Sequence, residues 1–260
     1  MKEQFVSLDT PSNEGICICA YGPIGVGKTD ALITLPDKLI IISNESKDIK
    51  RTIRTALKRR GELDRKIKVV EFDVFDDYVN YLSNLREQFL DGKRPCDSIG
   101  FDTLSFVASE FKTDLEDDRY KKDYKAEKRK NLLVDRFRFE IPDWGSIASM
   151  MKRVTWLLNK LSKYGVNVVA NAGMVEYPSY NKALEAAPNF QGKEYASIMA
   201  GYFDLVGIVR KNPETPSGYP PTIAFTSHDD EYVCRNCHER LEGDDGKPLN
   251  YAKILNAIKS

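Results

Sequence analysis

Residues 20–32 read AYGPIGVGKTDAL, and this stretch decides the fold. It contains the pattern G-x-x-x-x-G-K-[ST], which runs from Gly22 to Thr29. The glycines let backbone N–H groups approach phosphate oxygens, Lys28 adds a positive charge, and the Thr29 hydroxyl is a ligand for Mg²⁺. The apolar run GICICA precedes the pattern as a strand would, and GKTDALITL opens a helix. The residues predicted to contact a nucleotide are Gly22, Pro23, Gly25, Val26, Gly27, Lys28, Thr29 and Asp30.

Short apolar runs alternate with longer amphipathic or charged segments along the rest of the chain. Continuous apolar runs, unlike alternating ones, suit strands that helices cover on both faces. The pattern predicts an α/β fold with three layers and a mostly parallel central sheet flanked by helices. The predicted strands are residues 16–21, 39–43, 67–72, 98–102, 166–172, 205–210 and 222–226, and the predicted covering helices include 76–90 and 144–165, the second capped by Asp143.

Length and composition indicate one domain. The chain has 260 residues, of which 42% are hydrophobic, enough for one substantial core. We expect the core to span about residues 14–235 of the single domain 1–260, with a charged insert at about 112–140 and a C-terminal tail at about 236–260.

Two stretches break the alternation of apolar runs and amphipathic segments. The charged stretch 112–130 is either a loop or a solvated helix. Residues 173–195 mix aromatic, proline and lysine residues without a clear period.

Charge and hydropathy restrict the partners. Lysine plus arginine (39) equals aspartate plus glutamate (39), so any contact with a polyanion requires a local basic patch. Neither an apolar signal segment nor an apolar run of about 18 residues is found, which predicts a cytoplasmic protein without membrane contact.

Polar residues at the ends of predicted strands are candidate catalytic groups. Asp102 ends the run SIGFD and is predicted to organise Mg²⁺ together with Thr29, although it could merely cap the next helix. Thr103 follows where many AAA-type motors carry a water-activating glutamate, so the base must come from elsewhere. Glu45, after LIIISN, could orient the attacking water or be a solvated loop carboxylate. Asn171 could sense the γ-phosphate or satisfy its own loop.

These features together resemble the RecA-like P-loop NTPase core, and more closely the short phage-type nucleotide-binding proteins of that class, several of which act in single-strand annealing or recombination. The resemblance covers about residues 14–235. It implies ATP and Mg²⁺ as cofactors and an ATP hydrolase, slow and stimulated by DNA. It also implies Glu45 as catalytic base, Asn171 as sensor, and a homo-oligomeric ring or filament. A single-stranded DNA-binding protein is a further possible partner.

The resemblance also implies a function for the segment after Asn171. In the wider class this segment contacts single-stranded DNA, and here it offers rings for base stacking and lysines for phosphates. The residues are Tyr177, Tyr180, Lys182, Phe190, Lys193 and Tyr195. Hydrolysis in such assemblies usually takes a positive residue from the neighbouring subunit, for which the candidates are Lys193, Arg210 and Arg235.

Other interpretations remain open. The protein could be an ATP-dependent switch or mediator that binds protein partners with little turnover. It could also be a small-molecule or nucleotide kinase whose lid uses Arg119, Arg129, Arg136 or Arg138. Cys234, Cys237 and His238, with His228, are either incidental or a zinc site.

Overall fold

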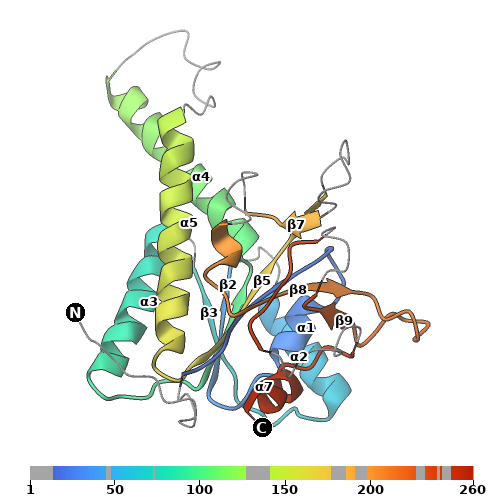
Figure 1. The fold of residues 1–260 in the computed structure, drawn as a ribbon. Helices are drawn as coiled ribbons and strands as arrows, with labels where there is room; N and C mark the ends of the chain where they lie inside the picture. Colours follow the sequence, from blue (N-terminus) through green and yellow to red (C-terminus); the bar gives the residue numbers. More distant parts are fainter. Residues whose placement is uncertain are drawn as a thin grey trace.

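A computed structural model describes residues 14–44, 48–72, 74–126, 141–176, 186–190, 198–226, 232–238, 241 and 247–259; the side chains of 119–126 and 141 are outside this description. Figure 1 shows a central sheet with helices on both sides. The strands of the main sheet are β1 (Cys17–Tyr21), β2 (Leu39–Ser43), β3 (Lys68–Glu71), β4 (Ser98–Asp102), β5 (Asn167–Ala172), β8 (Leu205–Arg210), β9 (Thr222–Ala224) and β10 (Arg235–Asn236). The helices are α1 (Lys28–Leu32), α2 (Ile49–Arg60), α3 (Phe75–Leu90), α4 (Leu104–Ala126), α5 (Ile141–Ser162) and α7 (Tyr251–Lys259).

The main sheet is mostly parallel, as predicted. Its strand order is β10-β8-β1-β5-β4-β2-β3, with β9 also paired to β8. The strands from β8 to β3 are parallel to their neighbours, whereas β9 and β10 run antiparallel to β8. Strand β1 therefore lies between β8 and β5, and the loop that follows β1 emerges at the edge where the other parallel strands also end.

Two hydrophobic layers enclose the sheet. On one face, Cys17 and Cys19 of β1 pack with buried side chains of α3, α4 and α5. On the other face, Ile18 and Ala20 of β1 pack with α1, α2 and α7. Figure 1 shows these two groups of helices on opposite sides of the sheet. The prediction of a three-layer α/β fold is thus confirmed.

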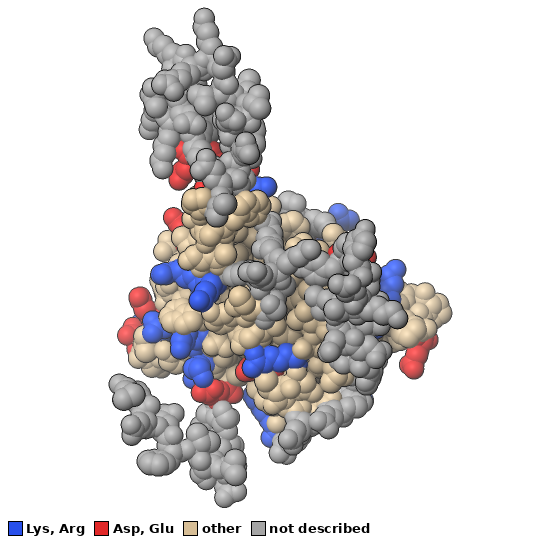
Figure 2. Space-filling view, turned by 45° about the horizontal axis from the view of Figure 1, so that its top comes forward, with Lys and Arg blue, Asp and Glu red and all other residues tan. Residues whose placement is uncertain are grey.

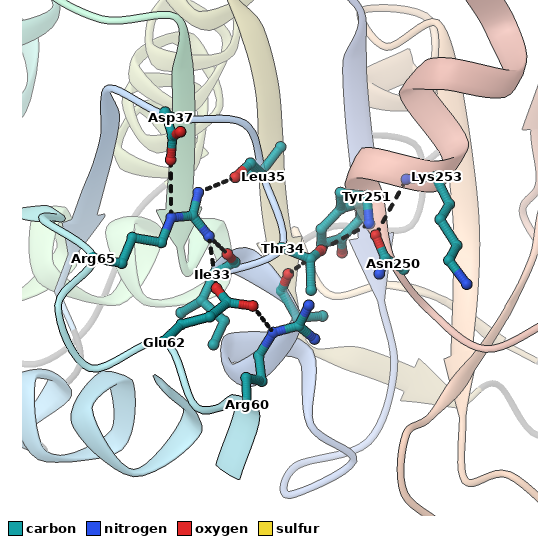
Figure 3. A network of polar contacts seen from close by, with 11 residues as sticks. Ile33, Thr34, Leu35, Asp37, Arg60, Glu62, Arg65, Asn250, Tyr251 and Lys253 are labelled. Carbon is teal, nitrogen blue, oxygen red and sulfur yellow. Dashed lines mark hydrogen bonds and ion pairs between the residues drawn. The ribbon is translucent and has the colours of Figure 1, made fainter. Parts of the chain in front are cut away.

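The short helix α1 is fixed at its C-terminal end by residues far away in the sequence (Figure 3). The Arg65 guanidinium donates hydrogen bonds to the carbonyl groups of Ile33, the C-cap of α1, and of Leu35 just beyond it. The Thr34 hydroxyl accepts a hydrogen bond of 2.8 Å from the backbone N–H of Tyr251 at the start of α7. These contacts attach the segment that ends α1 to Arg65, in the loop between α2 and β3, and to the start of α7.

Three segments differ in detail from the sequence-based prediction. Helix α5 begins at Ile141, so Asp143 lies in its first turn and does not cap it. Residues 112–126 form the second half of α4, which favours the helix over the loop for that part of the charged insert. Residues 173–195 are not wholly irregular, because β6 (Met174–Glu176) and β7 (Ala186–Pro188) form an antiparallel pair within them. No helix in the described part of the chain is both long and apolar enough to cross a membrane.

Candidate functional site

The loop between β1 and α1 has the geometry that its glycines predict. Gly25 and Gly27 have φ angles of 76° and 101°, in the left-handed region that glycine adopts without strain. A Cβ atom on Gly22 would lie 2.3 Å from the carbonyl oxygen of Val209, so only glycine fits between the loop and β8. The Lys28 ammonium donates hydrogen bonds of 2.8 Å to the carbonyl groups of Gly22 and Pro23, which folds this side chain back over the loop.

The side chain of Asp102, at the end of β4, connects the first turn of α1 with the end of β5. Its side chain is 2% exposed. One carboxylate oxygen accepts a hydrogen bond of 2.7 Å from the Thr29 hydroxyl, and the other accepts one of 2.8 Å from the Asn171 amide. The structure therefore brings together Thr29 and Asp102, which were predicted to act as a pair, and adds Asn171 to them. A hydroxyl and a carboxylate side by side are the hard oxygen ligands that Mg²⁺ prefers, so these residues fit that metal.

Asn171 lies behind Asp102 and is not among the residues that line the cavity of the site. Its side chain is fully buried, and its amide oxygen has no hydrogen-bond partner within the described part of the chain. The expected direct contact with phosphate does not match this position. Asn171 instead contacts the Asp102 carboxylate, to which its amide donates, and the sensor role stays a prediction.

Glu45 lies outside the described residues, but the residue before it is well placed. The backbone N–H of Asn44 donates to the carbonyl of Asp102 at 3.1 Å, and the Asn44 side-chain oxygen accepts from the N–H of Thr103 at 2.8 Å. Strand β2 pairs with β4 in a register that places Ser43 opposite Asp102. Asn44, the last described residue before position 45, thus lies directly beside the strand end that carries Asp102.

A cavity of about 1000 Å³ opens over the loop, a volume suitable for a nucleotide. Of the residues predicted to contact a nucleotide, those from Pro23 to Asp30 line it and Gly22 does not. Asp102 also lines it. Its other walls come from α2, the start of α4, the β6–β7 region and the β8–β9 loop, including Thr52, Arg59, Thr103, Ser105, Phe106, Ser109, Gly173, Met174, Val175, Glu176, Asn189, Lys211, Ser217, Gly218 and Tyr219.

Comparison with known families agrees with this geometry. A family model described as an AAA domain matches residues 14–239. The chain belongs to this AAA domain family. The match supports a P-loop NTPase, and membership indicates a nucleotide-binding ATPase. A search of curated proteins found no match.

In this AAA domain, the nucleotide cavity is also lined by Arg59 and Tyr219, which the sequence analysis did not identify. Arg59 of α2 forms an ion pair of 2.5 Å with Asp30 of α1. The Arg59 guanidinium carbon also lies 5.5 Å from the centre of the Tyr219 ring, at the end of the β8–β9 loop. Burial raises the pKa of the Asp30 carboxyl above its ordinary value, and the nearby Arg59 lowers it in part. No local pattern marks Arg59 or Tyr219, because only the fold brings them to the loop.

Ser105 connects the cavity of the AAA domain to the β6–β7 strand pair. Its hydroxyl accepts a hydrogen bond of 2.8 Å from the N–H of Gly173, which precedes β6. The same hydroxyl donates a bond of 2.8 Å to the carbonyl of Asn189, which follows β7. The N–H of Asn189 in turn donates to the carbonyl of Gly173 at 2.8 Å. One side chain on the cavity wall therefore holds both ends of this strand pair.

Most of the predicted DNA contacts lie outside the described part of the chain. Phe190 is the exception, and its prediction as a stacking residue is wrong for this conformation. The ring is 2% exposed and packs in the core between the sheet and α3, α4 and α5. The predicted contacts outside the described residues are Tyr177, Tyr180, Lys182, Lys193 and Tyr195.

The candidate residues for action on a neighbouring subunit already have contacts within the chain where they are described. The Arg210 guanidinium carbon lies 4.3 Å from the centre of the Tyr232 ring, and Arg235 donates to the carbonyl of Ala200 and to the Cys237 sulfur.

Most residues of the alternative interpretations are not described. Arg129, Arg136, Arg138 and His228, together with the side chain of Arg119, lie outside the description. Within the described part of the chain, no group of three or more potential metal ligands occurs.

Proposed function

We propose that this AAA domain is an ATPase that uses Mg-ATP, binds single-stranded DNA and acts in DNA recombination, annealing or replication. The observation that carries the nucleotide part is the hydrogen-bonded pair of Thr29 and Asp102, which line a cavity of about 1000 Å³ together with Lys28. Asn171 supports this pair from behind through its bond to Asp102. The DNA part rests on the resemblance to short phage-type recombination proteins and on the β6–β7 pair tied to that cavity.

Each residue of the site has a role in this proposal. Lys28 leaves its loop carbonyls to pair with phosphate oxygens, and the loop amides donate to the same phosphates. Thr29 and Asp102 would hold Mg²⁺, which supplies positive charge against the phosphate oxygens. Asn171 keeps the Asp102 carboxylate oriented. Glu45 orients the attacking water, a role supported by the two hydrogen bonds that link Asn44 with Asp102 and Thr103 and by the parallel β2–β4 pairing.

The coupling to DNA would pass through Ser105. Nucleotide in the cavity contacts the wall that includes Ser105, Gly173 and Asn189, and these residues hold both ends of the β6–β7 pair. Residues 177–185 between the two strands carry Tyr177, Tyr180 and Lys182 for bases and phosphates. A nucleotide-dependent change at Ser105 would thus alter the presentation of the DNA-binding segment.

DNA affinity with and without nucleotide tests the proposal. Binding of a fluorescent oligothymidylate is measured by anisotropy, at fixed salt, without nucleotide and with ATPγS plus Mg²⁺. We expect affinity to rise by about tenfold or more with nucleotide in the wild-type protein, and we expect Lys28→Ala to abolish this gain. Nucleotide binding without any effect on DNA affinity would refute the DNA part and leave the ATP-dependent switch for protein partners. Transfer of phosphate to a nucleoside monophosphate would instead support a kinase.

A further inference from the structure

A second cavity lies between α3 and α5 and shares no lining residue with the nucleotide cavity. Its volume is about 730 Å³. The walls combine apolar side chains from both helices with two cations of α5. The lining residues are Asp76, Val79, Ser149, Met150, Lys152, Arg153 and Trp156, and we call this cavity the α3–α5 groove.

Trp156 is the main apolar surface of the α3–α5 groove. It is 40% exposed, although indole is among the side chains that gain most from burial. The Arg86 guanidinium carbon lies 5.9 Å from the centre of its ring, and the Lys160 nitrogen lies 5.5 Å from it. The indole is therefore presented to solvent with a cation on α3 and another on α5 beside it.

The cations follow the helical repeat. Lys152, Trp156 and Lys160 are spaced four residues apart, so they form one stripe along α5, and Arg153 lies next to it. Lys152 and Arg153 are exposed, and Asp76 is the one acidic residue among those lining the groove. Figure 2 shows several Lys and Arg side chains at the left of the view, with Asp and Glu side chains beside them. A chain with zero net charge thus carries a local positive surface around an apolar groove.

We propose that the α3–α5 groove binds an acidic peptide segment of a partner protein. An apolar side chain of the peptide packs between Val79, Met150 and Trp156. Its carboxylates pair with the cations at the rim, which are Arg86, Lys152, Arg153 and Lys160. Charge complementarity selects an anion, and the apolar walls select a peptide over a nucleic acid. A nucleic-acid base would have to stack on the Trp156 indole, but the cations of Arg86 and Lys160 already lie near that ring. A concave apolar pocket is instead suited to an aliphatic or aromatic side chain of a peptide.

Tryptophan fluorescence tests this directly, because the chain has only two tryptophans and Trp144→Phe leaves Trp156 as the single reporter. The probe is the capped peptide Glu-Asp-Asp-Leu-Phe-Asp-Glu-Asp, and the controls are a version with Ser-Ser in place of Leu-Phe and an oligothymidylate. We expect the first peptide alone to change Trp156 emission saturably, with an affinity that falls as salt is raised.

Charge reversal then locates the site. In the same background, Lys152→Glu with Arg153→Glu should weaken peptide binding by about tenfold or more, because two attractive charges become repulsive. The matched control, Arg54→Glu with Lys58→Glu, reverses two exposed cations on α2, across the sheet, and should change the affinity by less than about twofold. Far-UV circular dichroism checks that both variants are folded. Failure of the acidic peptide to bind, or equal effects of the two charge reversals, overturns the proposal. Binding of oligothymidylate in its place, with the same sensitivity to Lys152 and Arg153, overturns it in favour of a nucleic-acid surface.

Discussion

The hydroxyl of Thr29 donates a hydrogen bond of 2.7 Å to the carboxylate of Asp102, which lies 73 positions later in the sequence. Strands β1 and β4 are separated by β5 in the sheet, yet their ends lie at one edge because all three are parallel. The fold thereby brings two residues that are far apart in the sequence into direct contact, as the proposed magnesium site requires.

Removal of the hydroxyl tests this pair. Thr29→Ala should lower ATP hydrolysis by about 10- to 100-fold, because the metal loses a ligand and Asp102 loses a hydrogen-bond donor. Thr29→Ser keeps the hydroxyl and should retain most of the activity. Steady-state kinetics at several Mg²⁺ concentrations measures both variants. Equal loss in the two variants would show that the methyl group, and not the hydroxyl, matters.

Asn171 should contribute to both stability and turnover. Asn171→Ala removes the donor to the second oxygen of a buried carboxylate, so the free energy of unfolding should fall by about 1–3 kcal/mol. The turnover number should fall as well, because Asp102 is then free to rotate. Urea unfolding and kinetics measure the two effects. Asn84→Ala, at an exposed position of α3, is the control and should change stability by about 0.5 kcal/mol or less. An Asn171→Ala protein with wild-type turnover would contradict the positioning role.

Ser105 should couple nucleotide to DNA. Ser105→Ala removes the two hydrogen bonds that hold the ends of the β6–β7 pair. The ratio of DNA affinities with and without saturating ATPγS should fall by about fivefold or more relative to wild type. Ser146→Ala removes a hydroxyl that bonds the Pro142 carbonyl within α5, where neither residue lines the cavity, and should leave the ratio unchanged. An unchanged ratio in the Ser105 variant would place the coupling elsewhere.

The phosphate loop and the sheet could be predicted from the sequence because both depend on local patterns. Each of the seven predicted apolar runs contains a strand of the main sheet, and the G-x-x-x-x-G-K-[ST] pattern specifies its own backbone geometry. Asp102 could be found because it ends one of these runs. Its partner Thr29 was already identified by the loop, so parallel strand ends were enough to bring them together.

The rest of the site depends on long-range packing that no local pattern contains. Arg59 and Tyr219 meet only because α2 and the β8–β9 loop both approach the phosphate loop. Phe190 stands in a polar, aromatic segment that reads as exposed, but the short strand β7 just before it directs its ring into the core. Asn171 was placed at the cavity because it is near the end of a strand. One residue of β5 remains after it, and its side chain faces Asp102.

Stability should fall at alkaline pH. Burial raises the pKa of the Cys96 thiol from 9.0 to about 12, and it also raises the pKa values of Cys17, Cys19, Tyr21 and Tyr251. In the unfolded chain these groups lose their protons at ordinary values, so above about pH 9 the unfolded state binds fewer protons than the folded state. Each buried cysteine should then cost about 1 kcal/mol of stability per pH unit. Urea midpoints at pH 7.5 and pH 10 measure the change. A constant midpoint would contradict the burial of these thiols.

The most direct test of the account is steady-state ATP hydrolysis with and without single-stranded DNA, for the wild-type protein and for Lys28→Ala, Glu45→Gln and Glu176→Gln. Glu176 is included because it is an acidic residue that also lines the cavity. The account predicts that DNA raises wild-type turnover and that Lys28→Ala abolishes hydrolysis. It also predicts that Glu45→Gln lowers turnover by about 30-fold or more while nucleotide still binds, and that Glu176→Gln has a smaller effect. Loss of turnover in Glu176→Gln with activity retained in Glu45→Gln would move the base to β6. Hydrolysis that is indifferent to both DNA and Lys28→Ala would contradict the central claim.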